Sequence, residues 1–420
     1  MKHSNDLYSI LYHATLITSM LNMLRVYSLL VFYQITTVKY LLLLSSYGLS
    51  VVLFVFSLSR YKGKERSLLF LMLLILLVLG YNSDYYAIVW FTFVLVIGAK
   101  GVYFRDIVKI HFIVSLCFCM MNMIGYKMGW LVQANNYSDG IREGLMGDWV
   151  QRYDFGYGWA TDYANHVFFI LLDWWILQRG RLNILGYVLF LYMPYFVIVY
   201  TDSRLAAGCI LLLLLASLYI KWKDKRNGQM SRFTKWCVIV SLPLFAFISI
   251  YATMAYDERN LFWFAANLLV SNRLGHGSDA LYEFGIPWVG QPVEMHGAID
   301  AGGLAEYNFV DCIYVQYLIR FGFFFLGILI YMYMKMAIKA ARRDDMVFLI
   351  AILIVGFSGV IAQYAFDFKF CVLPLALLVA HEQFNHCNYE NSTLKPSVRQ
   401  QLRRKPATVR IDESPSGHGA

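Results

Sequence analysis

The chain has 420 residues, of which 59% are hydrophobic and only 15% are charged, and its mean hydropathy is +0.53. This composition excludes an ordinary soluble protein, whose surface needs more polar residues, and it predicts a polytopic membrane protein. The formal net charge of +9 would suggest nucleic-acid binding in a soluble protein. Here the basic residues flank apolar runs, so we expect no nucleic-acid partner.

Apolar runs long enough to cross a bilayer follow one another along the chain, and we expect an all-α transmembrane helix bundle of about 12 spans. The first run lacks a small-residue cleavage site, so we expect it to remain as an anchor. The predicted spans lie near residues 7–24, 37–59, 67–80, 87–99, 107–127, 163–178, 183–200, 204–220, 236–255, 310–333, 346–364 and 368–385.

Lys and Arg cluster at alternate connections between these runs, as in RYKGKER (60–66) and KWKDKRNG (221–228), whereas the intervening connections are acidic. The positive-inside rule places the basic connections and both termini in the cytoplasm. We therefore expect a transmembrane domain over 1–387. The polar tail 388–420 is predicted to be disordered and cytoplasmic.

Two connections on the predicted outer side, 127–162 and 256–309, are much longer than a helix bundle requires. Both are rich in Trp, Tyr, Phe and Gly. Aromatic faces with polar edges suit a sugar chain, which presents apolar C–H faces and many hydroxyls. The alternative is that these aromatics form the interfacial belt common to membrane proteins.

Arginines on the predicted outer side are the sharpest candidates for function, because they oppose the positive-inside preference. Arg152, Arg204 and Arg273 each carry a planar fork of donors that matches phosphate oxygens. We hypothesise that they hold a lipid diphosphate and stabilise its charge as it leaves. The alternative pairs each with a nearby acid: Arg152 with Asp154, Arg204 with Asp202 and Arg273 with Asp279.

Other polar residues near the predicted outer mouths of spans are weaker candidates. His166 is either a proton carrier or a packed histidine, and His276 or His296 in the second long connection is a candidate general base. Asp162 and Asp311 each lie at the outer end of a span, where a carboxylate caps a helix or orients an arginine.

The cysteines show neither zinc-ligand spacing nor the pairing of a secreted disulfide framework. We expect them to be packing residues, and we expect no metal and no cofactor. They are Cys117, Cys119, Cys209, Cys237, Cys312, Cys371 and Cys387.

Five stretches, taken in order, resemble the Wzy-type polysaccharide polymerases, in particular the branch that makes capsules and exopolysaccharides. They cover much of the chain from about residue 40 to 385, although Ala160 stands where family members often have Pro. The stretches are IGAKGVYFRDIVKIHFI (97–113), RYDFGYGWATDYANHVFFILL (152–172), TDSRLAAG (201–208), SNRL (271–274) and NFVDCIYVQYLIRFG (308–322).

The resemblance implies an inverting glycosyl transfer at the outer face of a bacterial plasma membrane. Oligosaccharide repeat units linked to undecaprenyl diphosphate would be the substrates, and the growing chain would pass to the non-reducing end of an incoming unit. A chain-length regulator and a flippase are the expected protein partners, alongside membrane lipid.

The matched motifs also imply a set of site residues. For the chemistry we hypothesise that Arg152, Arg204 and Arg273 stabilise the diphosphate and that His276 or Asp162 acts as the base. The implied substrate contacts are Tyr153, His166, Thr201, Asp202, Ser203, Asn308, Asp311 and Tyr314.

Two other functions remain open from the sequence. An O-antigen-type ligase uses the same lipid-diphosphate donor but delivers the finished chain to another acceptor. A flippase or transporter of lipid-linked oligosaccharide would move the same substrate without chemistry, and it would favour short loops and charged residues in mid-span.

Overall fold

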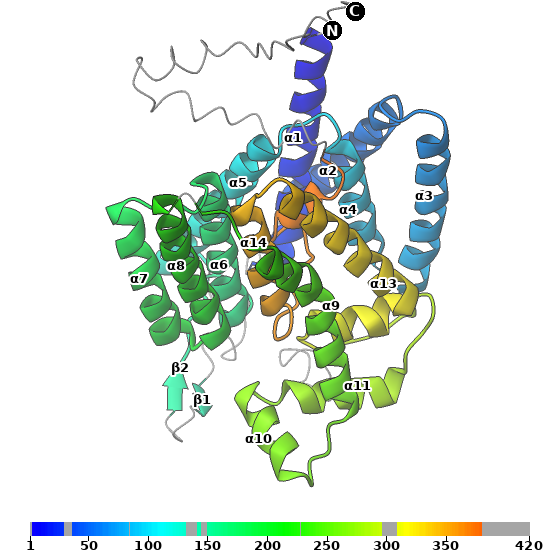
Figure 1. Cartoon of the computed structure of the whole chain (residues 1–420). Coiled ribbons are helices and arrows are strands. Elements are labelled where there is room, and N and C mark those ends of the chain that lie inside the picture. The colour runs from blue at the N-terminus through cyan, green and yellow to red at the C-terminus, as the bar shows by residue number, and fades with distance from the viewer. Residues whose placement is uncertain are drawn as a thin grey trace, which may run out of the picture.

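The computed structural model describes residues 2–28, 36–83, 85–131, 141–143, 149–226, 228–295 and 309–379. These residues form a helical protein with one short pair of antiparallel strands, β1 (Ile141–Glu143) and β2 (Trp149–Gln151) (Figure 1). The helices are α1 (Lys2–Leu24), η1 (Arg25–Tyr27), α2 (Thr36–Leu58), α3 (Lys64–Ser83), α4 (Tyr86–Gly98), α5 (Phe104–Lys127), α6 (Ala160–Leu177), α7 (Ile184–Thr201), α8 (Arg204–Lys225), α9 (Arg232–Met254), α10 (Leu261–Leu269), α11 (Arg273–Phe284), α13 (Ile313–Arg342), α14 (Met346–Ser358) and η3 (Leu373–Ala376).

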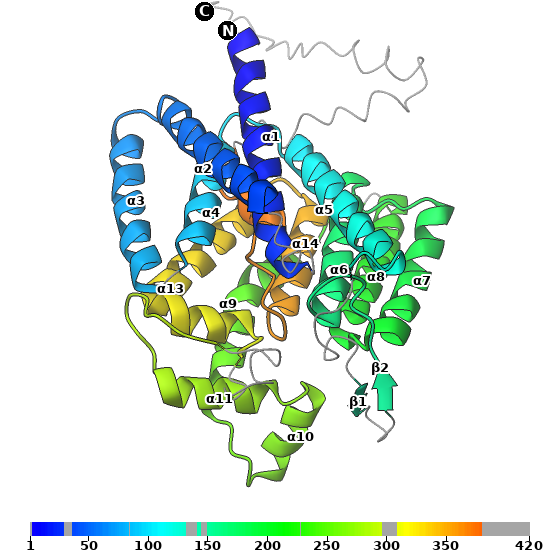
Figure 2. The same cartoon turned by 180° about the vertical axis from the view of Figure 1, so that it is seen from behind.

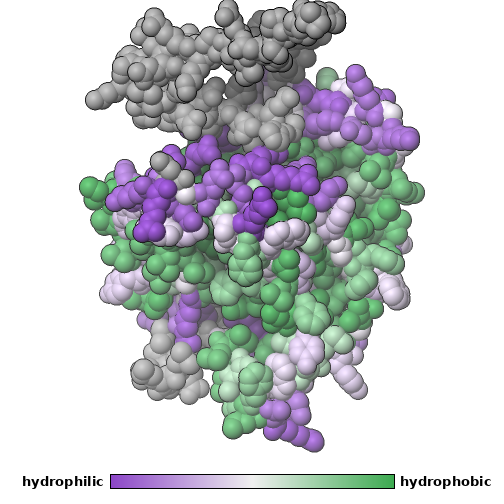
Figure 3. Space-filling view, viewed as in Figure 1, coloured by the Kyte–Doolittle hydropathy of each residue, from purple (hydrophilic) through white to green (hydrophobic). Residues whose placement is uncertain are grey.

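Seven of these helices are long and apolar enough to cross a membrane, namely α2, α3, α5, α7, α8, α9 and α13. Many of their large apolar side chains are exposed, such as Leu185 and Leu191 on α7. Figure 3 shows such side chains as a belt around the middle of the molecule, with hydrophilic side chains gathered above it. Water would not tolerate an apolar belt of this extent, so the chain has the character of a multi-pass membrane protein.

Helix α1 contacts α2, α4 and α5 (Figures 1 and 2). On one side of it α6 packs against α5, α7 and α8, and α14 contacts α6, α8, α9 and α13. On the other side lie α3 and α4. The strands and helices α10 and α11 lie at the end of the molecule opposite the N-terminus. The parts of the predicted long connections that are described therefore gather at one end.

A helix is present at each of the first eleven predicted spans, but the prediction of a twelfth helical span near 368–385 is wrong for its described part. Residues 359–379 are irregular except for η3. They pass from the end of α14 to the far end of α13, where Ala376 and Val379 lie beside Lys339. The chain thus makes this passage without a helix.

The irregular passage is tolerated because it is enclosed by protein, not lipid. Phe368, Phe370 and Leu373 are fully buried. The carbonyl of Phe368 lies 2.9 Å from Nε2 of His111, whose Nδ1 lies 2.5 Å from Asp173. Non-helical backbone at membrane depth is stable only when protein satisfies its polar groups. The hydropathy of this stretch therefore reflects burial in the protein core.

Helix α13 is broken at Gly322, which has a φ of 87°. The connection that follows α11 docks at the break: the amide of Gln291 donates to the carbonyl of Arg320, and that of Phe323 donates to the carbonyl of Pro287, both at 3.0 Å. A Cβ at position 322 would lie 2.7 Å from the carbonyl oxygen of Trp288. Glycine is required here both by the backbone angle and by this close approach.

Candidate functional site

One cavity of about 270 Å³ lies at the end of the bundle that carries α10 and α11. Five parts of the chain form it: the start of α6, the α7–α8 joint, the α10–α11 joint, Asp311 before α13, and the end of α14 with the passage after it. Its lining residues are Thr161, Asn165, Asp202, Ser203, Arg204, Leu205, Gly208, Leu269, Val270, Ser271, Arg273, Asp311, Phe357, Ile361, Ala362 and Tyr364.

The α7–α8 joint contributes Asp202, Ser203 and Arg204 because the chain reverses within two residues. Asp202 ends α7 in the left-handed conformation, with φ of 47°, and α8 begins at Arg204. A non-glycine residue held at positive φ is uncommon and is found preferentially at functional sites. Nε of Arg204 lies 3.4 Å from Oδ1 of Asp202, and the Arg204 side chain is 40% exposed.

The α10–α11 joint places Arg273 at the opposite wall. Ser271 and Asn272 are both left-handed, and Oδ1 of Asn267 accepts hydrogen bonds from the first backbone amides of α11. These contacts fix the direction in which α11 starts. Nε of Arg273 then donates to Oδ2 of Asp311 at 2.7 Å, which ties the joint to the segment before α13.

Two arginines therefore face one cavity, each as the first residue of its helix. A cation in the first turn opposes the helix dipole, so helix stability does not explain Arg204 or Arg273. A helix amino terminus favours an anion by about 0.3–1 kcal/mol, whereas a hydrogen bond to a charged group contributes about 1.5–3 kcal/mol. The guanidinium groups would therefore contribute more to anion binding than the two helix termini. Asp202 and Asp311 neutralise the arginines; Arg273 pairs with Asp311 and not with Asp279.

A buried carboxyl group lies directly behind the cavity. Asp162, in the first turn of α6, is 4% exposed and accepts a hydrogen bond from the hydroxyl of Tyr364, a lining residue. Oδ1 of Asn165, also a lining residue, has no partner among the described residues. The wall thus offers a hydroxyl coupled to a carboxylate and an open hydrogen-bond acceptor.

Arg152 lies behind the arginine pair and does not line the cavity. Its Nε donates to the carbonyl of Thr201 at 2.8 Å, and the amide of Tyr153 donates to the carbonyl of Tyr200 at 2.7 Å. The hydroxyl of Thr201 in turn donates to the carbonyl of Val197. Arg152 and Tyr153 thus stabilise the last turn of α7. The turn that carries the cavity residues follows immediately.

His166 and Tyr314 lie in the core. His166 is fully buried, and its Nδ1 lies 2.6 Å from the hydroxyl of Tyr157. Burial raises the pKa of Tyr157, so that phenol remains a donor. Tyr314 is also fully buried and donates to the carbonyl of Gly356 at 2.7 Å. Both side chains are placed to hold the packing around the cavity.

Of the remaining candidates, only His276 is described. His276 lies one turn along α11 from Arg273 and is half-buried, but it does not line the cavity. Asn308 and His296 lie outside the described residues.

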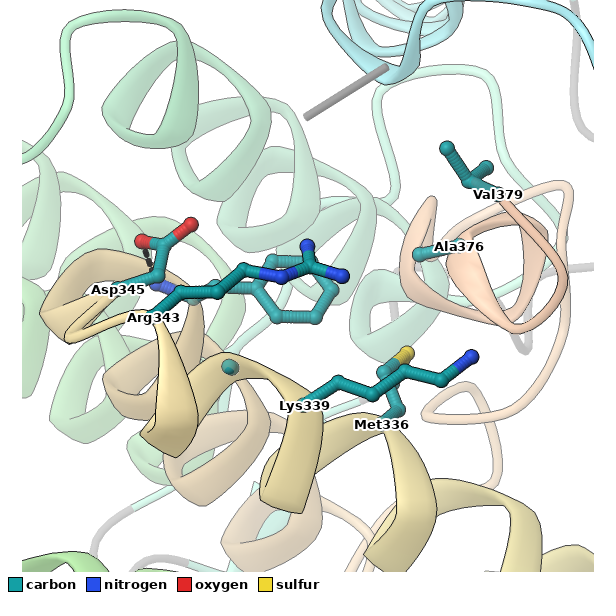
Figure 4. A pocket seen from close by; sticks show the side chains of 8 residues that line it. Met336, Lys339, Arg343, Asp345, Ala376 and Val379 are labelled. Carbon is teal, nitrogen blue, oxygen red and sulfur yellow. Dashed lines mark hydrogen bonds between the residues drawn. The ribbon is translucent and has the colours of Figure 1, made fainter. Parts of the chain in front are cut away.

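A second hollow lies at the opposite end of α13, where Lys339 and Arg343 extend toward Ala376 and Val379 (Figure 4). Its volume of about 10 Å³ is enough for about one water molecule. It is therefore a packing gap, and the larger cavity is the candidate site.

No model of a known protein family, no curated protein and no solved structure matches the chain. Within the described part of the chain, no group of three or more His, Cys, Asp or Glu side chains is arranged to hold a metal ion.

Sequence reasoning missed Thr161, Asn165 and Tyr364 as lining residues. Helical spacing could have identified the first two, because Asn165 follows Thr161 by four residues and both lie on one face of α6. Tyr364 carries no such signal. It lies in the irregular passage after α14, whose path depends on tertiary packing.

Proposed function

We propose that the protein is a membrane polysaccharide polymerase that joins oligosaccharide repeat units carried on undecaprenyl diphosphate. One observation carries the proposal: Arg204 and Arg273, each at the start of a helix, line the same cavity as Tyr364, which is hydrogen-bonded to Asp162. A diphosphate-binding group and a proton acceptor are what this transfer needs.

In the proposed reaction, a hydroxyl of the incoming repeat unit attacks the anomeric carbon of the growing chain. The new C–O bond forms as the bond from that carbon to the diphosphate breaks, and the sugar is inverted. Arg204 and Arg273 stabilise the negative charge that develops on the leaving diphosphate. The hydroxyl proton passes to the oxygen of Tyr364 as Tyr364 releases its own proton to Asp162.

The size of the cavity sets what can enter it. At about 270 Å³ it is slightly smaller than the roughly 300–1,000 Å³ of sites that enclose a drug-sized ligand. We infer that it holds the diphosphate and the reacting sugar. The rest of each glycan would extend past α10 and α11, and the prenyl chains would lie in the surrounding lipid.

We propose that α10, α11 and the strands face outward across a bacterial plasma membrane, with both termini in the cytoplasm. The alternation of basic and acidic connections supports this orientation. In this arrangement eleven helices and the buried passage 359–379 make twelve crossings.

In our account, Arg152 positions the Asp202–Arg204 turn through Thr201. We assign His166 and Tyr314 to the packing behind the cavity. A chain-length regulator and a flippase remain proposed partners.

Replacing each cavity arginine by lysine tests this function, since lysine keeps the charge but loses the planar fork. In detergent, with lipid-linked repeat units as the only substrate, the parent protein should produce a ladder of chain lengths. Arg204→Lys and Arg273→Lys should each slow elongation by about a hundredfold. Arg181→Lys is the matched control, because Arg181 pairs through Nε with Asp224 at 2.8 Å on an exposed surface.

The same assay separates the rival functions. A ligase would need a different acceptor to form product, and a transporter would leave the repeat units unchanged, because no bilayer is present. Unchanged elongation in both lysine variants would eliminate the diphosphate role of these arginines.

A further inference from the structure

A buried guanidinium lies away from the cavity, on α13 just before its break. Arg320 is 7% exposed, and its Nε has no hydrogen-bond partner among the described residues. No described carboxylate pairs with it, and its guanidinium carbon lies 4.5 Å from the ring centroid of Tyr85.

A buried cation without a counter-ion is unusual. Transfer of an ion from water into a protein interior is costly unless an opposite charge and hydrogen bonds compensate, and a cation–π contact offsets only a small part of that cost. Intramembrane charges are rare and mark functional positions. The nearby pair of Lys369 and Asp367 illustrates the usual solution, since these two buried residues neutralise each other.

The described surroundings of Arg320 supply further hydrogen-bond donors. The phenols of Tyr85, Tyr27 and Tyr317 are the groups that act on it electrostatically. Their hydroxyls make no hydrogen bond within the described part of the chain, and all three side chains remain partly accessible. The guanidinium of Arg320, whose Nε is unpaired among the described residues, and three phenols therefore lie in the same region.

The position of Arg320 is fixed by the broken helix. Its own carbonyl accepts from the amide of Gln291, and the amide of Gly290 donates to the carbonyl of Phe321, both at 3.0 Å. The side-chain amide of Gln291 adds bonds to the carbonyls of Phe284 and Ile319. The guanidinium is thus held on a rigid element, which favours specific binding.

We propose that Arg320, with the hydroxyls of Tyr27, Tyr85 and Tyr317, binds a phosphate-bearing anion at a site separate from the Arg204–Arg273 cavity. Phosphate oxygens match the arginine fork and accept hydrogen bonds from phenols. The anion comes either from a lipid-linked diphosphate or from free phosphate in solution.

The site stands on this geometry alone and does not require the proposed polymerase activity. Two aromatic ring contacts connect the Arg320 site to the cavity. The ring centroids of Tyr364 and Phe370 are 4.7 Å apart, and those of Phe370 and Tyr27 are 5.2 Å apart. Two phosphate sites suit a reaction that joins two lipid-linked units, one as donor and one as acceptor.

The test measures anion binding to the full-length protein in detergent by titration calorimetry. The background is the double variant Arg204→Gln/Arg273→Gln, which disables the cavity. Inorganic pyrophosphate and a short-chain prenyl diphosphate are the two probes. We expect binding in this background and its weakening by about tenfold or more on adding Arg320→Gln, with Tyr317→Phe weakening it in the same direction. Binding of the prenyl diphosphate alone would assign the anion to a lipid, and binding of both probes would show that the phosphate group suffices.

Thermal unfolding without added anion supplies a second readout. If Arg320 lacks an internal counter-ion, Arg320→Met should leave the midpoint unchanged or raise it, because an uncompensated charge is removed. Asp84 precedes Tyr85 in the sequence and lies outside the described residues. A fall in the midpoint for Arg320→Met, matched by Asp84→Asn, would identify an internal ion pair and overturn the proposal. Failure of both probes to bind, or binding unaffected by Arg320→Gln, would also overturn it.

Discussion

Tyr364 and Asp162 lie 202 positions apart in the chain, yet they form the contact on which the proposed proton transfer depends. Tyr364 contributes the hydroxyl that reaches the cavity, whereas Asp162 is withdrawn behind it. A carboxylate withdrawn from the cavity accepts a proton through the hydroxyl that is hydrogen-bonded to it. The phenol, not the acid, therefore meets the substrate in this arrangement.

Removing that hydroxyl should separate turnover from folding. Tyr364→Phe keeps the ring and its packing against Phe370 but breaks the link to Asp162. We expect elongation to fall by about a hundredfold or more, with binding of the lipid-linked donor preserved. The measurement is the initial rate of chain growth alongside donor affinity.

Tyr314→Phe is the control for this prediction. It also removes one buried tyrosine hydroxyl, here bonded to the carbonyl of Gly356, and should cost about 1 kcal/mol of stability without a comparable loss of rate. Equal rates for Tyr364→Phe and the parent would remove Tyr364 from the mechanism.

Among the elements, α13 differs most from a simple span. Its break at Gly322 creates a site where another backbone segment docks, and this contact locks the connection after α11. Breaks in membrane helices are stable where protein groups bond the exposed backbone, as they do here. Arg273 lies at the start of α11, so the break also helps to hold the helix that carries a cavity arginine.

Two glycines on α13 give a matched test of this element. A Cβ on Gly322 would lie 2.7 Å and 2.8 Å from two carbonyl oxygens, whereas one on Gly327 would meet nothing within 4 Å. We expect Gly322→Ala to destabilise the protein by about 2 kcal/mol or more, because strain and clash act together. Gly327→Ala should be neutral or stabilising by up to about 1 kcal/mol. Thermal unfolding in detergent measures both, and equal midpoints would mean that the break is not structurally required.

At the scale of the whole molecule, polar groups lie at the two ends and in the interior. An apolar belt lies between the ends. Two buried polar pairs lie at the irregular passage 359–379: His111 with Asp173, and Asp367 with Lys369. His111 attaches the passage to α5 through the carbonyl of Phe368, whereas Asp367 and Lys369 pair within the passage. The cavity lies where that passage meets the starts of α6, α8 and α11.

The proposed orientation predicts opposite accessibility at the two ends. Glu258 precedes α10, Arg226 follows α8, and both are exposed. In intact cells, a membrane-impermeant thiol reagent should label Glu258→Cys but not Arg226→Cys, relative to the parent protein. After the membrane is permeabilised, both should be labelled. Labelling of Arg226→Cys alone in intact cells would invert the topology.

The sequence by itself determined the helical membrane character, the location of eleven helices and the stretches that contribute Arg204, Arg273 and Asp311. Hydropathy and charge are local properties, and each follows from composition within one segment. Only the tertiary structure decided that Arg273 pairs with Asp311, that Tyr364 reaches Asp162, and that residues 359–379 pass through the bundle without a helix. The hydropathy of an apolar run is the same whether lipid or protein surrounds it. Contacts between distant residues depend on how the helices pack.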